Sequence, residues 1–238
     1  MIFIKQKRLP LWSNSNFKKM APKKTSITRD KIVSMYMIYR LEHHDKPKSV
    51  YQFAKTNGFD ESEFYAFFGT LERLEKEVFK IFLDQTLEMI QKDKNYETYD
   101  MKSKVLSFYF TFFELLSANR SYVVMNLKEH QNQLKNLILL SNVRVGFKNF
   151  ITEIITDEVR TQNERFQNFQ EKTIQESAWI QFLLTLKFWL DDESAAFEKT
   201  DIFIEKSVKA TFELMNIAPI DSLIDFGKFI FKEKIYAK

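Results

Sequence analysis

Cysteine and histidine, two residue types that commonly carry out catalysis or bind metals, are absent or scarce in this sequence. Cysteine is absent from the 238 residues, so no disulfide, thiolate metal site or cysteine nucleophile can form. The histidines are the adjacent His43 and His44 and the distant His130, a spacing that matches no metal-binding motif. A glycine-rich phosphate loop and a nucleophile elbow are also missing. We therefore expect a protein that is not an enzyme and that uses neither a metal nor a cofactor.

One stretch does concentrate groups that bind phosphate. Lysine ammonium groups, hydroxyl groups and the free amides at a helix N-terminus are the protein groups that commonly contact the DNA backbone. The candidate DNA-binding residues are Lys46, Lys48, Ser49, Lys55, Ser62 and Tyr65, together with Lys24 and Arg29 upstream.

Three short helices are predicted to position these groups. Thr28, Ser49 and Asp60 each precede a helical segment and offer a side-chain oxygen to its unpaired amides. Ser49 is followed three residues later by Gln52, and Asp60 by Glu63, so capping boxes are expected at both starts.

The turn between the second and third helices contains Gly58, which can adopt the left-handed conformation that ends one helix and starts the next at a steep angle. Two short helices joined in this way form a helix-turn-helix. Around this turn the sequence contains, in order, Ser49-Val50, Phe53-Ala54, Gly58-Phe59-Asp60, Phe64-Tyr65, Phe67-Phe68, Thr70, Glu72 and Leu74. Through these residues and their spacing, residues 28–74 resemble the DNA-binding head of the TetR-type transcriptional regulators. It implies a homodimer that binds operator DNA and responds to a small hydrophobic ligand held in a helical body.

Two kinds of residue depart from that family's pattern. Phe67 stands where the family usually has histidine and Leu71 where it usually has lysine, and both family positions commonly contact phosphate. Asp60, Glu61 and Glu63 place three carboxylates in the first turn of the recognition helix. Carboxylates stabilise a helix start, but close to DNA each repels a phosphate by about 0.5 to 1 kcal/mol in water. We therefore expect binding to duplex DNA that these carboxylates weaken.

Composition favours an all-α protein with a small head and a larger body. Hydrophobic residues make up 45% of the chain, which is enough for a substantial core, and only four Gly and four Pro are present. We predict a basic arm over residues 1–24, a helix-turn-helix domain over 25–74, and a helical ligand-binding and dimerisation domain over 75–238.

The positive charge is concentrated at the start of the chain. Residues 1–31 contain nine Lys and Arg against one Asp, whereas the remainder contains 27 basic and 31 acidic residues. Such an arm either lies along DNA, with Lys24 and Arg29 as its contacts, or is a solvated tail. Residues 1–20 contain no apolar run long enough for a signal peptide or a membrane span, so we expect a cytoplasmic location.

Hydrophobic periodicity predicts six helical segments in the body. They cover residues 70–90, 105–116, 121–140, 143–166, 175–190 and 197–215. The first carries an apolar stripe of Leu71, Leu74, Val78, Ile81, Phe82, Met89 and Ile90, and the fourth has a buried face of Val143, Phe147, Phe150, Ile151, Ile154 and Ile155. Gly146 lies inside the fourth segment. It indicates either a close approach of another helix at this point or a loss of helix stability that the protein tolerates.

The last two segments carry the stripes Trp179, Phe182, Leu183, Leu186, Trp189 and Leu190, and Ile204, Val208, Phe212 and Met215. By resemblance to the TetR family these stripes form the dimer interface; the alternative is that they lie in the interior of the protomer. The candidate ligand-binding residues are Phe108, Phe112, Phe147, Phe150, Trp179 and Phe182. The alternative is that these residues belong to the hydrophobic core and bind no ligand.

Two further functions remain open. Residues 219–238 alternate apolar residues with lysines, which suits either a final packed helix or a helix on an anionic membrane surface. Lipid-binding relatives with the TetR fold in ubiquinone biosynthesis use such a helix and do not bind DNA. A DNA-independent lipid or hydrophobic-ligand carrier is therefore the alternative function, and an interaction subunit that docks proteins through its head is a third.

Overall fold

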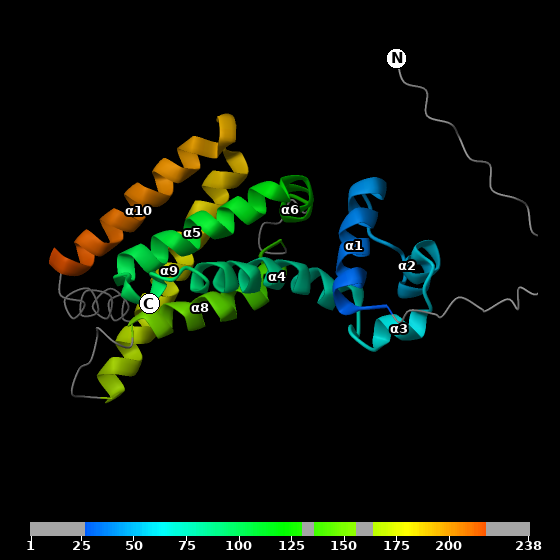
Figure 1. Ribbon diagram of the computed structural model, residues 1–238, viewed down its shortest axis with the longest axis horizontal. Helices are drawn as coiled ribbons and strands as arrows, with labels where there is room; N and C mark the ends of the chain where they lie inside the picture. Colours follow the sequence, from blue (N-terminus) through cyan, green and yellow to red (C-terminus); the bar gives the residue numbers. More distant parts are fainter. Residues whose placement is uncertain (1–26, 130–135, 156–163, 218–238) are drawn as a thin grey trace, which may run out of the picture.

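A computed structural model describes residues 27–129, 136–155 and 164–217. The described part of the chain is all-α and contains no strand. Its elements are α1 (Arg29–His43), α2 (Val50–Asn57), α3 (Glu61–Tyr65), α4 (Leu71–Gln91), η1 (Tyr96–Thr98), α5 (Met101–Ala118), α6 (Arg120–Leu127), η2 (Ile138–Leu140), α8 (Ser141–Ile155), α9 (Glu164–Asp191), η3 (Ala195–Phe197) and α10 (Glu198–Ile217). The helices α1 to α3 form a head at one end, and α4 runs from them into the larger body (Figure 1).

Local capping explains where the head helices begin. The Thr28 hydroxyl accepts from the Lys31 amide at 3.3 Å, and the Ser49 hydroxyl accepts from the Gln52 amide at 3.1 Å. The predicted capping box at Asp60 is present, with the Asp60 amide donating to Glu63 at 3.0 Å. These bonds satisfy amides that have no partner inside their own helix.

The capping box predicted at Ser49 is present in altered form, because one of its two hydrogen bonds has a different donor. The Gln52 side chain accepts from the Lys48 amide at 2.9 Å, one residue earlier than predicted. Gly58 closes α2 with φ at 73°, so the predicted left-handed turn is confirmed.

The long helix α4 joins the head to the body. It begins after the cap residue Thr70, as predicted, and most of the predicted apolar stripe is buried or partly buried. Met89 is the exception, because its side chain is 49% exposed. The buried face is instead completed by Phe79, Leu83 and Thr86, which the three-and-four spacing also allows.

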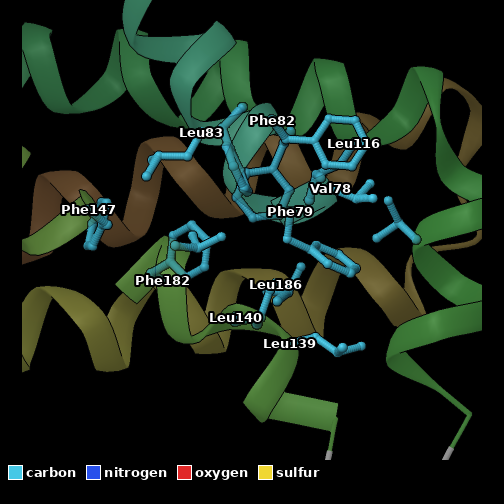
Figure 2. Packing of buried hydrophobic residues seen from close by; sticks show 14 of the residues in the cluster. Val78, Phe79, Phe82, Leu83, Leu116, Leu139, Leu140, Phe147, Phe182 and Leu186 are labelled. Carbon is cyan, nitrogen blue, oxygen red and sulfur yellow. The ribbon is translucent and has the colours of Figure 1, made fainter. Parts of the chain in front are cut away.

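Aromatic side chains dominate the core of the body. The helix α4 lies against α5 and α8, α8 lies against α9, and α10 lies against both α5 and α9. Figure 2 shows side chains from four separate parts of the chain converging: Val78, Phe79, Phe82 and Leu83, then Leu116, then Leu139, Leu140 and Phe147, then Phe182 and Leu186. Each buried side chain of this size contributes roughly 1.5 to 3 kcal/mol relative to exposure.

The predicted buried face of the segment 143–166 is confirmed, since all six of its members are buried in α8. The predicted bounds differ, because α8 ends at Ile155 and α9 already begins at Glu164, before the predicted start at residue 175. Gly146 marks a close approach of α8 to α4, because a Cβ at this position would clash with the Leu83 side chain. The prediction of one helix over residues 121–140 is wrong, because α6 ends at Leu127 and a 3-10 turn occupies Ile138–Leu140.

Most of the apolar stripes on α9 and α10 face the interior of the protomer. Leu183, Leu190 and Phe212 are partly buried, and the side chain of Met215 lies outside the described residues. Trp179, Phe182, Leu186 and Trp189 are buried, as are Ile204 and Val208, so these residues are core and do not form an exposed interface. The opposite face of α9 carries exposed apolar residues at four-residue spacing: Ile180, Leu184 and Phe188.

The turn between α9 and α10 is held by two charged side chains. Arg120 lies over the rings of Trp189 and Phe197, at 4.5 and 4.4 Å, and donates to carbonyls at the end of α9. Asp192 is buried and accepts from the amides and hydroxyls of Ser194 and Thr200 at 2.6 to 2.9 Å. Among the described helices, none is long and apolar enough to cross a membrane.

Candidate nucleic-acid interface

Four of the predicted DNA-binding side chains are exposed on α2, on α3 and on the two residues that precede α2. Lys48, Ser49, Lys55 and Ser62 are all exposed, and neither lysine forms an ion pair within the described part of the chain. The Ser49 oxygen accepts the Gln52 amide, which leaves its O–H free to donate to an anion. The ammonium of Lys55 lies over the Tyr51 ring at 5.8 Å.

Tyr65 is exposed, but its hydroxyl has a partner within the head. It donates to the Glu61 carboxylate at 3.1 Å. Partial burial and this neighbouring carboxylate raise the pKa of Tyr65, so the hydroxyl keeps its proton. A phosphate that is to accept from Tyr65 must therefore displace Glu61.

Two of the predicted contacts are engaged elsewhere. Arg29 forms an ion pair with Glu77 of α4, and its guanidinium lies 5.7 Å from the Phe68 ring centre. Lys46 forms an ion pair with Glu75 of α4 at 2.8 Å. Both cations tie the head to α4, so neither is presented freely to DNA. Lys24 lies outside the described residues.

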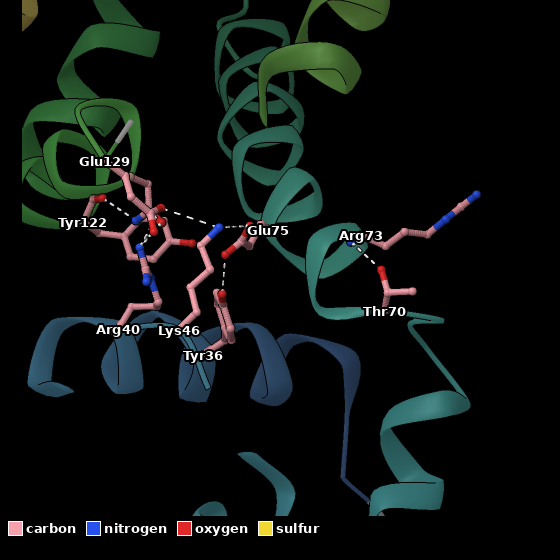
Figure 3. A network of polar contacts seen from close by, with 9 residues as sticks. Tyr36, Arg40, Lys46, Thr70, Arg73, Glu75, Tyr122 and Glu129 are labelled. Atoms are coloured by element: carbon pink, nitrogen blue, oxygen red, sulfur yellow. Dashed lines mark hydrogen bonds and ion pairs between the residues drawn. The ribbon is translucent and has the colours of Figure 1, made fainter. Parts of the chain in front are cut away.

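The contacts of Lys46 belong to a junction between head and body (Figure 3). The Glu75 side chain is 3% exposed and accepts from Lys46 through one oxygen and from the Tyr36 hydroxyl, at 2.5 Å, through the other. Burial and the adjacent Glu75 carboxylate raise the pKa of Tyr36, which keeps its hydroxyl a donor. Glu75 thus joins α1 and the residues after it to α4.

A second tie joins the head to α6. The Arg40 side chain is 1% exposed and donates to Asn126 at 3.0 Å and to Glu129 at 3.1 Å. The Nε and Nη1 atoms of Arg40 are buried without a partner in the described part of the chain, as is the nearby Tyr122 hydroxyl. The Lys46 ammonium also lies 3.5 Å from Glu129, so the contacts to α4 and those near α6 meet in one network (Figure 3). We call the contacts of Glu75 the α4 tie and the contacts of Arg40 the α6 tie.

The sequence interpretation did not name Arg73 or Tyr51 as candidate contacts, and it did not predict that Phe67 is exposed. Arg73 lies exposed in the first turn of α4, and Figure 3 shows its side chain extending away from the polar contacts of the junction. Tyr51 and Phe67 are 58% and 43% exposed. The sequence does not show whether an aromatic residue is exposed. It does show that Arg73 follows Leu71 by two residues, so Arg73 could have been predicted as a phosphate contact near the usual family lysine.

The six predicted ligand-binding aromatics lie together in the body, and their rings contact one another. Phe108 lies 4.9 Å from Phe150 and 5.1 Å from Phe147, and Phe182 lies 5.0 Å from Trp179. The whole set of Phe108, Phe112, Phe147, Phe150, Trp179 and Phe182 is buried, so these rings largely fill the space between their helices. Phe147 also lines a hollow of about 40 Å³.

A wider groove of about 420 Å³ lies at the surface between α6, η2 and α9. Its floor is rich in leucine, including Leu140, Leu183 and Leu186. No cluster of side chains suited to a metal ion occurs among the described residues. Of the histidines, His43 stacks on Tyr39 with ring centres 4.1 Å apart, and His130 lies outside the described residues.

Comparison with known families identifies the body. Residues 104–230 match the family described as "Tetracyclin repressor-like, C-terminal domain", and this range covers more than half of the 238 residues. The chain therefore belongs to the TetR family, whose members are regulators. The match lies in the body, whereas the resemblance described above lies in the head. No curated protein matches the chain.

Proposed function

We propose that this protein is a ligand-responsive transcriptional regulator that binds duplex DNA as a homodimer. The observation that carries this proposal is the capped helix-turn-helix of α2 and α3, with Lys48, Ser49 and Lys55 exposed and unengaged by carboxylates, on a TetR-family body. The free amides at the start of α2 and the guanidinium of Arg73 at the start of α4 add further phosphate donors. Arg73 compensates in part for Leu71, which occupies the position of a usual family lysine.

A second copy of the chain supplies the second head. The exposed apolar face of Ile180, Leu184 and Phe188 on α9 continues onto α10, where Phe203 stacks on Phe188 with ring centres 4.5 Å apart and Ile202 is 48% exposed. An apolar face of this kind is normally covered by a partner. We propose that this face pairs with the same face of a second protomer.

Ligand response then takes the form of a two-state equilibrium. The body holds the head through the α4 tie and the α6 tie, which involve different helices. A ligand that binds more tightly to one arrangement of α4 and α6 changes the distance between the heads, and only such a difference in affinity can shift the population.

The acidic start of α3 supports the second candidate, a DNA-independent carrier of lipid or hydrophobic ligands. Asp60, Glu61 and Glu63 lie where the recognition helix begins, and Tyr65 is bonded to one of them. The membrane contact proposed for residues 219–238 belongs to this alternative and lies outside the described residues.

Binding to random duplex DNA, measured by fluorescence anisotropy over a range of salt concentrations, separates the two candidates. For the regulator, log K falls steeply with log salt, and the slope becomes less steep by about 0.9 for each phosphate contact removed. We expect this reduction for Lys48→Gln and for Arg73→Gln. Lys209→Gln, an exposed lysine of α10 paired with Glu213, is the matched control and leaves the slope unchanged. Absence of binding at the lowest salt concentration favours the carrier.

A further inference from the structure

A small hollow lies among α5, α8, α9 and α10, inside the domain that matches the TetR family. Its volume of about 40 Å³ is roughly three times the 10 to 15 Å³ that one water molecule needs. The lining is mainly aliphatic, with Val105, Ile151 and Ile154 among its members, and it includes no charged side chain. Ile174 and Phe212, which also line the hollow, are only partly buried.

Tyr109 lines this hollow and carries a hydrogen-bonding group with no partner. The residue is 2% exposed, and its hydroxyl has no hydrogen-bond partner in the described part of the chain. Burial raises the pKa of Tyr109, so the hydroxyl keeps its proton and remains a donor. A buried donor without an acceptor is unfavourable and requires an explanation.

The other polar groups of the lining are already paired. The Thr211 hydroxyl and the Gln181 side-chain oxygen are 3.1 Å apart, and the Gln181 amide donates to Ser207 at 3.3 Å. The unmet hydrogen-bonding capacity of the hollow therefore resides in Tyr109. Tyr122 also has a buried hydroxyl without a partner, but it lies at the head junction and is not among the residues that line this hollow.

We infer that the hollow receives the hydrogen-bond acceptor of an uncharged, largely aliphatic ligand, and that the Tyr109 hydroxyl donates to this acceptor. The inference rests on the proposed function, because it specifies the ligand class to which the regulator responds. A charged ligand is disfavoured, since no side chain of opposite charge is available to offset its desolvation. A ketone, ester or lactone carbonyl on an aliphatic chain has the required chemistry.

Three probes of equal chain length separate the contributions of the hydrogen-bond acceptor, the aliphatic chain and a charge. They are methyl heptyl ketone, nonane and nonanoate. Their binding is measured by thermal shift and by isothermal titration calorimetry with the full chain, with Tyr109→Phe and with the control Tyr122→Phe. We expect the ketone to raise the melting temperature of the unsubstituted protein most and nonanoate to leave it unchanged. In Tyr109→Phe the ketone binds about three- to tenfold more weakly, the cost of one hydrogen bond, while nonane binds as before. In Tyr122→Phe the ketone binds with full affinity.

The variants without ligand give an independent readout. Removal of a hydroxyl that has no partner leaves the melting temperature unchanged or raises it, which we expect for Tyr109→Phe. A lower melting temperature shows that a held water or another group already satisfies Tyr109, and it overturns the inference. Equal ketone affinity in the protein and in Tyr109→Phe also overturns it, because the ketone then binds elsewhere, such as in the leucine-rich groove. Failure of all three probes has the same consequence.

These results are independent of DNA binding. A protein that binds DNA but not the ketone retains the proposed function and loses only this inference. A protein that binds the ketone through Tyr109 but binds no DNA retains the site and favours the carrier.

Discussion

The ammonium nitrogen of Lys46 lies 2.8 Å from the carboxylate of Glu75, which joins the segment after α1 to the buried side of α4. Glu75 also accepts from the Tyr36 hydroxyl, so one side chain of α4 holds two residues of the head. The pair is partly shielded, because the Lys46 side chain is 36% exposed and that of Glu75 only 3%. Loss of one partner of a partly buried ion pair costs more than it does at the surface, because the other partner is left desolvated without a compensating charge.

Replacement of Glu75 by glutamine is the first prediction. Glu75→Gln retains the shape of the side chain but removes the nearer of the two carboxylates that compensate Lys46, the other being Glu129 at 3.5 Å. We expect the free energy of unfolding to fall by about 1 to 3 kcal/mol. Urea denaturation measures this change, and hydrogen exchange should show lower protection of α1. The matched control is Glu88→Gln, which removes an exposed pair with Lys92 and should cost less than about 0.5 kcal/mol. Equal effects of the two substitutions would contradict a structural role for the junction.

Neutralisation of Glu61 is the second prediction and concerns DNA affinity. Glu61→Gln removes one carboxylate from the start of α3, and the glutamine oxygen can still accept from Tyr65. Because a nearby carboxylate repels phosphate by about 0.5 to 1 kcal/mol, we expect DNA to bind about two- to fivefold more tightly. Anisotropy at low salt measures the change. Glu63 is less suitable for this test, since it also caps α3. Unchanged affinity would place the start of α3 away from the DNA backbone.

The third prediction concerns the packing of α8 on α4. In Gly146→Ala, the added methyl group clashes with Leu83, which is 1% exposed and has little room to move. Overpacking costs about 1 to 3 kcal/mol, and the gain in helix propensity of up to about 1 kcal/mol offsets only part of it. We expect a lower free energy of unfolding by thermal denaturation.

Two comparisons control this experiment. Gly69→Ala places its methyl group where no atom lies within 4 Å, so it should change stability by less than about 0.5 kcal/mol. In the double variant with Leu83→Ala the cost of Gly146→Ala should shrink, because the truncated side chain makes room for the methyl group. Additive costs in the double variant would mean that Leu83 is not the residue that Gly146 accommodates.

The fourth prediction is a pH dependence centred on Asp192. Burial acts to raise the pKa of Asp192, but hydrogen bonds from Thr200 and Ser194 outweigh it and lower this pKa to about 2. The pKa of an aspartate carboxyl in the unfolded chain is about 3.9. A carboxyl whose pKa is lower than this in the folded state stabilises the fold at every pH above about 3.9. This stabilisation is lost as the pH falls from about 4 to about 2.

The Asp192→Asn variant isolates this contribution from the other carboxylates. At neutral pH we expect it to be less stable than the unsubstituted protein by roughly 1 to 2 kcal/mol, because it loses charge-assisted hydrogen bonds at the start of α10. The difference in the free energy of unfolding should diminish as the pH is lowered toward 2. Carboxyl groups titrate roughly between pH 6 and pH 2.5. If the stability difference between the variant and the unsubstituted protein stayed constant over this range, ionised Asp192 could not be its source.

The fifth prediction tests the proposed dimer face. Leu184 is 56% exposed, so Leu184→Asp should leave the protomer folded and shift a dimer toward monomer. Size-exclusion chromatography with light scattering measures the mass. Val145→Asp on α8 is the control, since Val145 is 61% exposed but lies on another helix, and it should leave the dimer intact. The opposite pattern would move the interface to α8.

Features that depend on neighbours close in sequence were predictable from the residues alone. The caps at Thr28 and Ser49 each bond an amide three residues later, and Gly58 needs only its own backbone freedom to end α2. The buried face of α8 follows from its periodicity, since the more apolar side of a helix in a protein of this size turns inward. The all-α class and the TetR resemblance rest on signals of this local kind.

The tertiary structure decided which partner each charged side chain has and which apolar face of α9 is buried. Lys46 looked like a phosphate contact, but its partner Glu75 lies 29 residues away, and no local pattern indicates that pairing. On α9 both faces carry large apolar residues, so periodicity could not distinguish the side that holds Trp189 in the core from the side that leaves Leu184 exposed. The sequence alone determined the all-α class and the starts of the head helices and of α4, because the capping bonds at Thr28, Ser49, Asp60 and Thr70 lie within a few residues. The roles of Lys46 and Leu184 were settled only by folding, because they depend on which distant side chains the helix packing brings within contact.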